Sequence, residues 1–114
     1  MSLHARSGVV VVLMTAPDAR TAENLSEQLL EERLIACANV LPGVRSVYRW
    51  EGALQRDDEV LVLLKTTPES VAELSERIAA LHPYDVPEVL ALPVSSGLAA
   101  YTQWVGTEVE SSRG

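Results

Sequence analysis

Cysteine is almost absent from this sequence, because Cys37 is the only one among 114 residues. A single cysteine excludes a disulfide within the chain, and a free thiol is typical of proteins from reducing compartments. The sequence also lacks any run near the roughly 18 apolar residues that a membrane-spanning helix needs. Its first apolar run, Val9–Met14, is too short for the core of a secretory signal and is better explained as a strand. These absences predict a cytoplasmic protein that does not enter a membrane.

Basic residues are scarce as well. Nine lysines and arginines stand against 16 aspartates and glutamates, which gives a formal net charge of −7 and a pI near 4.7. No basic stripe is available to neutralise phosphates, so the sequence predicts no nucleic-acid or anionic-membrane partner. Apolar residues make up 47% of the chain and charged residues 22%, as in an ordinary soluble domain. The length fits one domain that can bury a core without disulfides.

The order of apolar and turn-forming residues predicts four strands and three helices. The expected strands are 8–15, 34–50, 58–66 and 88–94, and the expected helices are 18–33, 67–82 and one that begins near Leu98. The continuous β-branched run of the first strand indicates a central strand covered on both faces. Pro42-Gly43 predicts a bulge or kink inside the second strand. Residues 51–57 are expected to form a hairpin loop.

This order repeats a strand–helix–strand unit and adds a C-terminal helix. It predicts an α+β, ferredoxin-like split β-α-β sandwich, with a four-stranded sheet and both main helices on one face. A doubly wound parallel sheet would need a helical crossover between the second and third strands. The connection at 51–57 is too short for one.

The second expected strand is about three times the usual length, so the hairpin that it forms should project beyond the sheet. Tyr48 and Trp50 lie on one face of it at a period of two and are candidate interface anchors. Exposed strand edges are usually paired or covered, which predicts a cyclic oligomer of this chain. The alternative is a hairpin that folds back over its own sheet.

Four stretches together resemble one family. They are VVVVLMTAPD, LIACANVLPGVRSVYRWEG, DEVLVLLKTT and LHPYDVPEVLALPV. In this order and spacing they resemble the CutA family of divalent-cation tolerance proteins over nearly the whole chain. The resemblance implies one domain at 8–107, and the sequence on either side of it, at 1–7 and 108–114, predicts flexible termini. The resemblance further implies a cytoplasmic homotrimer akin to the PII signalling proteins, associated with tolerance of copper and other divalent metals, without catalytic activity or an organic cofactor.

The same resemblance implies a copper site at Cys37, His82 and Glu88. Thiolate and imidazole are the ligands that soft and borderline metals select, so such a set favours copper or zinc over magnesium. Some family members carry a further cysteine where this chain has Met14, and a thioether can still bind Cu(I). No close pair of ligands with regular spacing occurs. A metal site therefore has to be assembled by the fold or across subunits.

Each of these three residues also has an ordinary structural interpretation. Cys37 can be a small buried residue, and His82 can form hydrogen bonds at the end of its helix. Glu88 can start a strand and accept hydrogen bonds from another subunit. The prolines around His82 and Glu88 predict a rigid corner between the second helix and the fourth strand.

Catalytic motifs are missing. The loop after the first strand, Thr15–Asp18, has no glycine to cradle a phosphate and ends in an acidic residue. The sequence therefore predicts a protein that is not an enzyme. The alternative to metal binding is a PII-like sensor with a small-ligand cleft between subunits. Tyr84, His82 and Glu88 of one chain would face Tyr101 or Trp104 of another, and together they would line that cleft.

Overall fold

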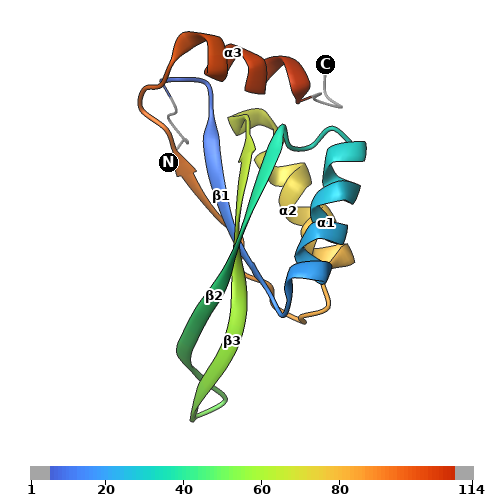
Figure 1. The fold of residues 1–114 in the computed structure, drawn as a ribbon, viewed down its shortest axis with the longest axis vertical. Helices are drawn as coiled ribbons and strands as arrows, with labels where there is room; N and C mark the ends of the chain where they lie inside the picture. Colours follow the sequence, from blue (N-terminus) through green and yellow to red (C-terminus); the bar gives the residue numbers. More distant parts are fainter. Residues whose placement is uncertain (1–5, 110–114) are drawn as a thin grey trace.

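The fold is seen in a computed structural model, which describes residues 6–109. Its elements follow in the order β1 (Val10–Ala16), α1 (Ala19–Glu31), β2 (Cys37–Trp50), β3 (Ala53–Thr66), a short 3₁₀ turn (Pro68–Ser70), α2 (Val71–Leu81), β4 (Leu90–Pro93) and α3 (Ala99–Glu108). Figure 1 shows α1 and α2 together on one side of the sheet and α3 across one end. At the other end, the β2–β3 hairpin projects well beyond the helices.

The sheet has four strands in the order β2-β3-β1-β4, and every neighbouring pair is antiparallel. β1 is central, as predicted, with Val10 opposite Thr66 of β3 and Pro93 of β4. An α+β chain with a four-stranded antiparallel sheet and three helices is therefore confirmed. The outer edges of β2 and β4 pair with no other strand in the part of the chain that is described.

The core lies between the sheet and the two helices α1 and α2. Alternate residues of β1 face these helices, since Val10, Val12 and Met14 are fully buried while Val11 and Leu13 are only partly so. Helix residues Leu25, Leu29, Leu74 and Ile78 complete the same cluster. At the end of the sheet that α3 covers, away from the hairpin tip, Val105 of α3 packs on Val9 and Ala36 in a second, smaller cluster. Both main helices thus bury one face against the sheet.

The other face of the sheet is apolar but has no covering layer within one chain. Leu13 of β1 lies opposite Leu63 of β3 and Leu90 of β4, and paired residues share a face. Leu90 and Leu92 are 54% and 48% exposed on this face. The continuous apolar run of β1 predicted that both faces of the strand are covered. Within one chain only one face is covered, by α1 and α2.

The hairpin differs from its prediction in one respect. Residues 53–57 belong to β3, and the loop is only the two-residue turn Glu51-Gly52, in which both residues have a positive φ, 49° and 81°. Such a turn matches the twist of paired strands. The polar stretch 55–58 looks like a loop in the sequence because this part of the hairpin stands in solvent. The irregularity at Pro42-Gly43 is confirmed by a register shift between Leu41 and Val44.

The helix starts were predicted with mixed success. The Asp18 carboxylate accepts a hydrogen bond from the Thr21 N–H at 2.7 Å, so Asp18 caps α1, which begins close to its predicted start at residue 18. This hydrogen bond also holds the pKa of Asp18 below its ordinary value. At the start of the second expected helix, the Thr67 side chain donates to the Ser70 hydroxyl and caps no backbone N–H.

The ends of the expected domain are tied to the body of the fold where they are described. The Ser7 hydroxyl donates to the Val94 carbonyl at 2.6 Å, and Glu108 is the last residue of α3. Residues 1–5 and 110–114 of the two termini that were expected to be flexible lie outside the described residues.

One ion pair joins the end of α1 to α2. The Arg77 guanidinium donates to both oxygens of Glu32, at 2.7 and 2.8 Å. These hydrogen bonds lower the pKa of Glu32 from its ordinary 4.5 to about 2. The pair therefore contributes stability above pH 4.5, and this contribution is lost as the pH falls towards 2.

We expect Glu32→Gln to lower the free energy of unfolding at pH 7 by about 0.5–1 kcal/mol, because the pair is partly exposed to solvent. Urea unfolding at pH 7 and pH 3 measures this effect, and the difference between parent and variant should shrink at the lower pH. Glu31→Gln, one residue earlier on an exposed position, is the control for loss of charge alone. An equal loss in both variants would contradict a specific contribution of the pair.

Candidate functional site

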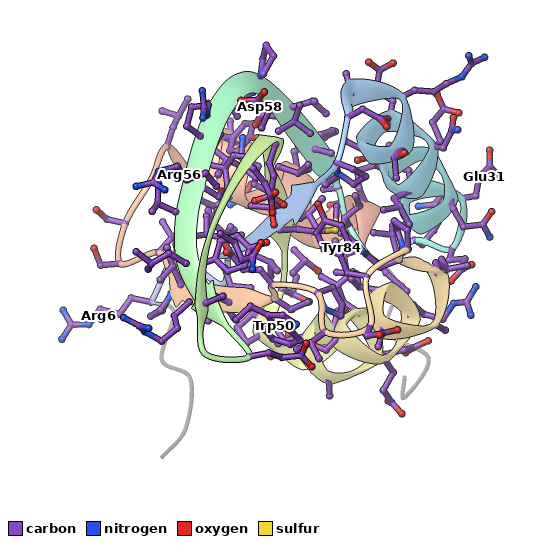
Figure 2. All side chains as sticks on the ribbon, turned by 90° about the horizontal axis from the view of Figure 1, so that it is seen from below. Arg6, Glu31, Trp50, Arg56, Asp58 and Tyr84 are labelled. Atoms are coloured by element: carbon purple, nitrogen blue, oxygen red, sulfur yellow. The ribbon has the colours of Figure 1, made fainter. Side chains whose placement is uncertain are left out.

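A cleft of about 590 Å³ lies where β1 ends, between the base of the hairpin and the loop that joins α2 to β4. Residues of three segments line it: Thr15 from β1; Ser46, Val47, Tyr48, Trp50, Asp57 and Glu59 from the hairpin; and Tyr84, Asp85, Val86 and Glu88 from the loop. Figure 2, seen from the hairpin tip, shows Trp50 and Tyr84 between the hairpin and the helices. The predicted corner at 81–94 therefore forms one wall of this cleft.

His82 fastens this corner to the end of β1. It caps the C-terminus of α2 and is only 7% exposed. Its Nδ1 accepts the Tyr84 N–H at 3.0 Å, so its Nε2 carries the proton and donates to the Thr15 carbonyl at 2.8 Å. Both ring nitrogens are thus engaged by backbone groups. This arrangement agrees with the structural interpretation of His82, as a hydrogen-bonded residue at its helix end.

Glu88 lies in the cleft wall, and its predicted place at the start of a strand is wrong. β4 begins at Leu90, so Glu88 belongs to the preceding loop and is exposed. The register that pairs Leu13 with Leu90 would place Glu88 opposite Thr15. The Thr15 carbonyl accepts a hydrogen bond from His82, and the pairing of β1 with β4 ends at Leu13 and Leu90.

Two tyrosines bind carboxylates on the floor of the cleft. The Tyr84 hydroxyl donates to Glu59 at 2.7 Å, and the Tyr48 hydroxyl donates to Asp57. Glu59 is only 9% exposed. Burial, and then the hydrogen bond to Glu59, raise the pKa of Tyr84 far above its ordinary value. Both hydroxyls consequently keep their protons at physiological pH and orient the two rings.

Sequence analysis missed Asp57 and Glu59. It assigned Asp57 to a loop and gave Glu59 no role. The available signal was the alternation of β3, in which Glu59 shares a face with Leu61 and Leu63. A carboxylate at the head of an apolar row is unusual unless another group contacts it.

Cys37 lies elsewhere. It begins β2 opposite Lys65, whose ammonium is 4.0 Å from the Cys37 sulfur. Lys65 in turn lies opposite Val11, four residues before Thr15 on β1, which is roughly 13 Å at strand spacing. Within one chain, Cys37 therefore does not reach His82 and Glu88.

The other expected contributors are also separate from the cleft. Met14 is fully buried in the core, on the face of β1 that packs on the helices. Tyr101 and Trp104 lie on α3, at the opposite end of the sheet. Only another chain could bring either aromatic residue to the cleft. Among the residues that the structure describes, no group of three or more His, Cys, Asp or Glu side chains is placed to hold a metal ion.

The sequence matches the model of one known protein family. Residues 10–108 match the profile of the CutA1 divalent ion tolerance proteins. The chain belongs to this family.

Relatives and solved structures agree with this assignment. The divalent-cation tolerance protein CutA of Thermus thermophilus is 47% identical over 95 residues, which are 83% of this chain and 92% of that protein. The crystal structure of CutA1 from Oryza sativa is similar with a TM-score of 0.88 at 39% identity, covering 91% of this chain and 95% of that one. The resemblance expected from the four sequence stretches is confirmed, and the CutA family is named for tolerance and not for an enzymatic activity.

The CutA relatives contradict the prediction of a cytoplasmic protein. A relative from Arabidopsis thaliana, 42% identical over 84% of this chain and 53% of its own length, is named chloroplastic. A similar structure from Archaeoglobus fulgidus, with a TM-score of 0.86 at 33% identity, is described as periplasmic. One free cysteine and the absence of a basic stripe do not distinguish these compartments. No helix in the described range is long and apolar enough to cross a membrane.

The three copper ligands that the resemblance to CutA implies, Cys37, His82 and Glu88, are not placed to bind one ion together within a single chain. His82 would have to release a backbone partner to bind a metal, and a lysine ammonium faces Cys37. Of these three residues, only Glu88 lines the cleft. Cys37, His82 and Glu88 stay a prediction for a site built from more than one chain.

Proposed function

We propose that this chain acts without catalysis, as a homotrimer of ferredoxin-like subunits arranged as in the PII proteins, and binds a divalent cation such as copper. Membership of the CutA family supports the role in divalent-cation tolerance. The strand order, with both main helices on one face, supports the ferredoxin-like assignment. The observation that carries the proposal is the acidic cleft around Glu88, described next.

Four carboxylates line the cleft, those of Asp57, Glu59, Asp85 and Glu88, and no lysine or arginine is among the lining residues. None of the four takes part in the two ion pairs found in residues 6–109. Uncompensated carboxylates at one place attract cations, and oxygen donors suit divalent ions. Soft donors such as Cys37 would join them only from a neighbouring chain.

The uncovered sheet face supports assembly. Its apolar residues, including Leu13, Leu63, Leu90 and Leu92, would be buried by further copies of the chain. The free outer edges of β2 and β4 are different surfaces, so their pairing between copies would be head-to-tail, which gives a ring when the rotation from copy to copy closes. The resemblance to CutA proteins implies three copies in that ring.

Native mass spectrometry tests assembly and metal binding in one measurement. We expect a species of three chains, and a metal adduct on it after addition of Cu(II) or Zn(II). Glu88→Gln should weaken the adduct, while Asp58→Asn should not, because Asp58 lies on the opposite face of β3 and pairs with Arg45. A monomer at micromolar concentration would contradict the assembly, and unchanged metal binding in Glu88→Gln would remove the cleft as the metal site.

A second candidate is a small-ligand sensor of the PII type. The cleft has the volume of small-molecule sites, which is roughly 300–1,000 Å³, and three aromatic side chains help to line it. Aromatic walls add nothing to the binding of a small hydrated metal ion. This observation favours an organic ligand.

A further inference from the structure

We propose that the cleft binds a primary organic ammonium ion, with the ammonium held by the carboxylates and the apolar body against the rings of Tyr48, Trp50 and Tyr84. The inference gives a ligand class to the small-ligand function above and does not depend on metal binding.

The charge of the cleft selects a cation. Glu59 is nine-tenths buried, and its carboxylate receives the neutral Tyr84 hydroxyl but no cationic partner in the described structure. Asp57 is likewise bonded by a phenol, and Asp85 and Glu88 complete the acidic lining. A buried carboxylate without a counter-ion is costly, and an incoming cation would offset that cost.

The same hydrogen bonds disfavour an anion. The Tyr48 and Tyr84 hydroxyl protons are both committed to carboxylates, so neither is free to donate to a ligand. The side-chain donors that remain in the lining are the hydroxyls of Thr15 and Ser46 and the indole N–H of Trp50. A phosphate or carboxylate ligand would therefore meet four negative groups and few donors.

The aromatic rings select an organic body. Trp50 lines the cleft and is 49% exposed in the single chain, so its indole presents an aromatic surface there. The hydrogen bonds of the two tyrosines fix their rings before a ligand arrives, which lowers the entropy cost of binding. Aromatic faces attract an ammonium group and also bury the carbon body attached to it. A primary ammonium adds three donors that match the free carboxylate oxygens.

The test compares 2-phenylethylammonium with its neutral isostere, 2-phenylethanol, by isothermal titration calorimetry on the chelator-treated full-length protein. We expect the ammonium to bind in the millimolar range or tighter, and the alcohol about tenfold more weakly or worse. Equal affinity for the two compounds, or no heat of binding for the ammonium, would overturn the inference.

Two variants locate the site. Glu88→Gln and Trp50→Leu should each weaken ammonium binding by about threefold to tenfold, whereas Asp58→Asn, with the same change of charge on the opposite face of β3, should leave it unchanged. If all three variants bind like the parent, the ammonium binds outside the cleft and the proposal fails. Because no metal is present, this result is independent of the metal adducts seen by mass spectrometry.

Discussion

Replacing His82 with alanine is expected to lower the free energy of unfolding by about 2–4 kcal/mol. The substitution removes two hydrogen bonds at once, one to the Thr15 carbonyl and one from the Tyr84 N–H. Both backbone groups are shielded by the corner, so each loses a partner that water replaces poorly. Urea unfolding followed by circular dichroism, at one fixed protein concentration because assembly contributes to stability, measures the loss.

Two further substitutions separate the two hydrogen bonds. His82→Asn can keep an acceptor near the position of Nδ1, and His82→Gln can place an N–H donor near the position of Nε2. We expect each to recover part of the stability lost in His82→Ala. A loss below about 0.5 kcal/mol in His82→Ala would mean that the corner does not depend on these bonds, and would restore His82 as a candidate ligand with free nitrogens.

The sequence predicts the helices and the sheet where the local pattern and the packing agree. The β-branched run at Val10–Val12 belongs to the central strand, and Asp18 caps the helix that follows it. The pairing of β2 with β3 followed from the short connection expected at 51–57, since a hairpin makes the two strands that it joins antiparallel neighbours.

The hairpin and the fourth strand were predicted less well because their limits depend on tertiary contacts. Residues 55–58 are polar because they project into solvent, and polar alternation does not distinguish such a strand from a loop. β4 is short because His82 occupies the carbonyl of Thr15, and nothing in the local sequence near Glu88 signals this.

The site could be predicted only in part, since its composition depends on strand register. His82, Tyr84 and Glu88 are close in sequence, and the corner brings all three to the cleft or its wall. Asp57 and Glu59 belong to β3, and Glu59 is 25 residues before Tyr84 in the sequence. The pairing of β3 with β1 brings both carboxylates to the cleft. Cys37 shares the sheet but is assigned by the same register to the far end.

His82 and Glu88 differ in whether their side chains are available to bind a cation. Both ring nitrogens of His82 are hydrogen-bonded to backbone groups of the corner and of β1. The Glu88 carboxylate lines the cleft, and no hydrogen bond to it is found within residues 6–109. A cation that enters the cleft therefore meets oxygen donors and aromatic rings before any imidazole or thiolate. This order of donors favours weak, exchangeable binding over a closed soft-metal site.

Met14 is the remaining soft donor, and we expect Met14→Ala to lower the free energy of unfolding by about 2–5 kcal/mol. Its side chain is fully buried among the core residues under α1 and α2, so alanine leaves a cavity there. Met14→Leu nearly conserves the volume and should cost less than about 1.5 kcal/mol.

The pair Met14→Ala and Met14→Leu separates packing from metal ligation. A fully buried thioether on the helix-facing side of β1 is closed off from the cleft, which is lined by the next residue, Thr15. Met14→Leu should therefore keep both the oligomer and the metal adduct of the parent in native mass spectrometry. If Met14→Leu unfolds like the parent but loses its metal adduct, the thioether is a ligand, and the core position of Met14 does not describe the metal-bound protein.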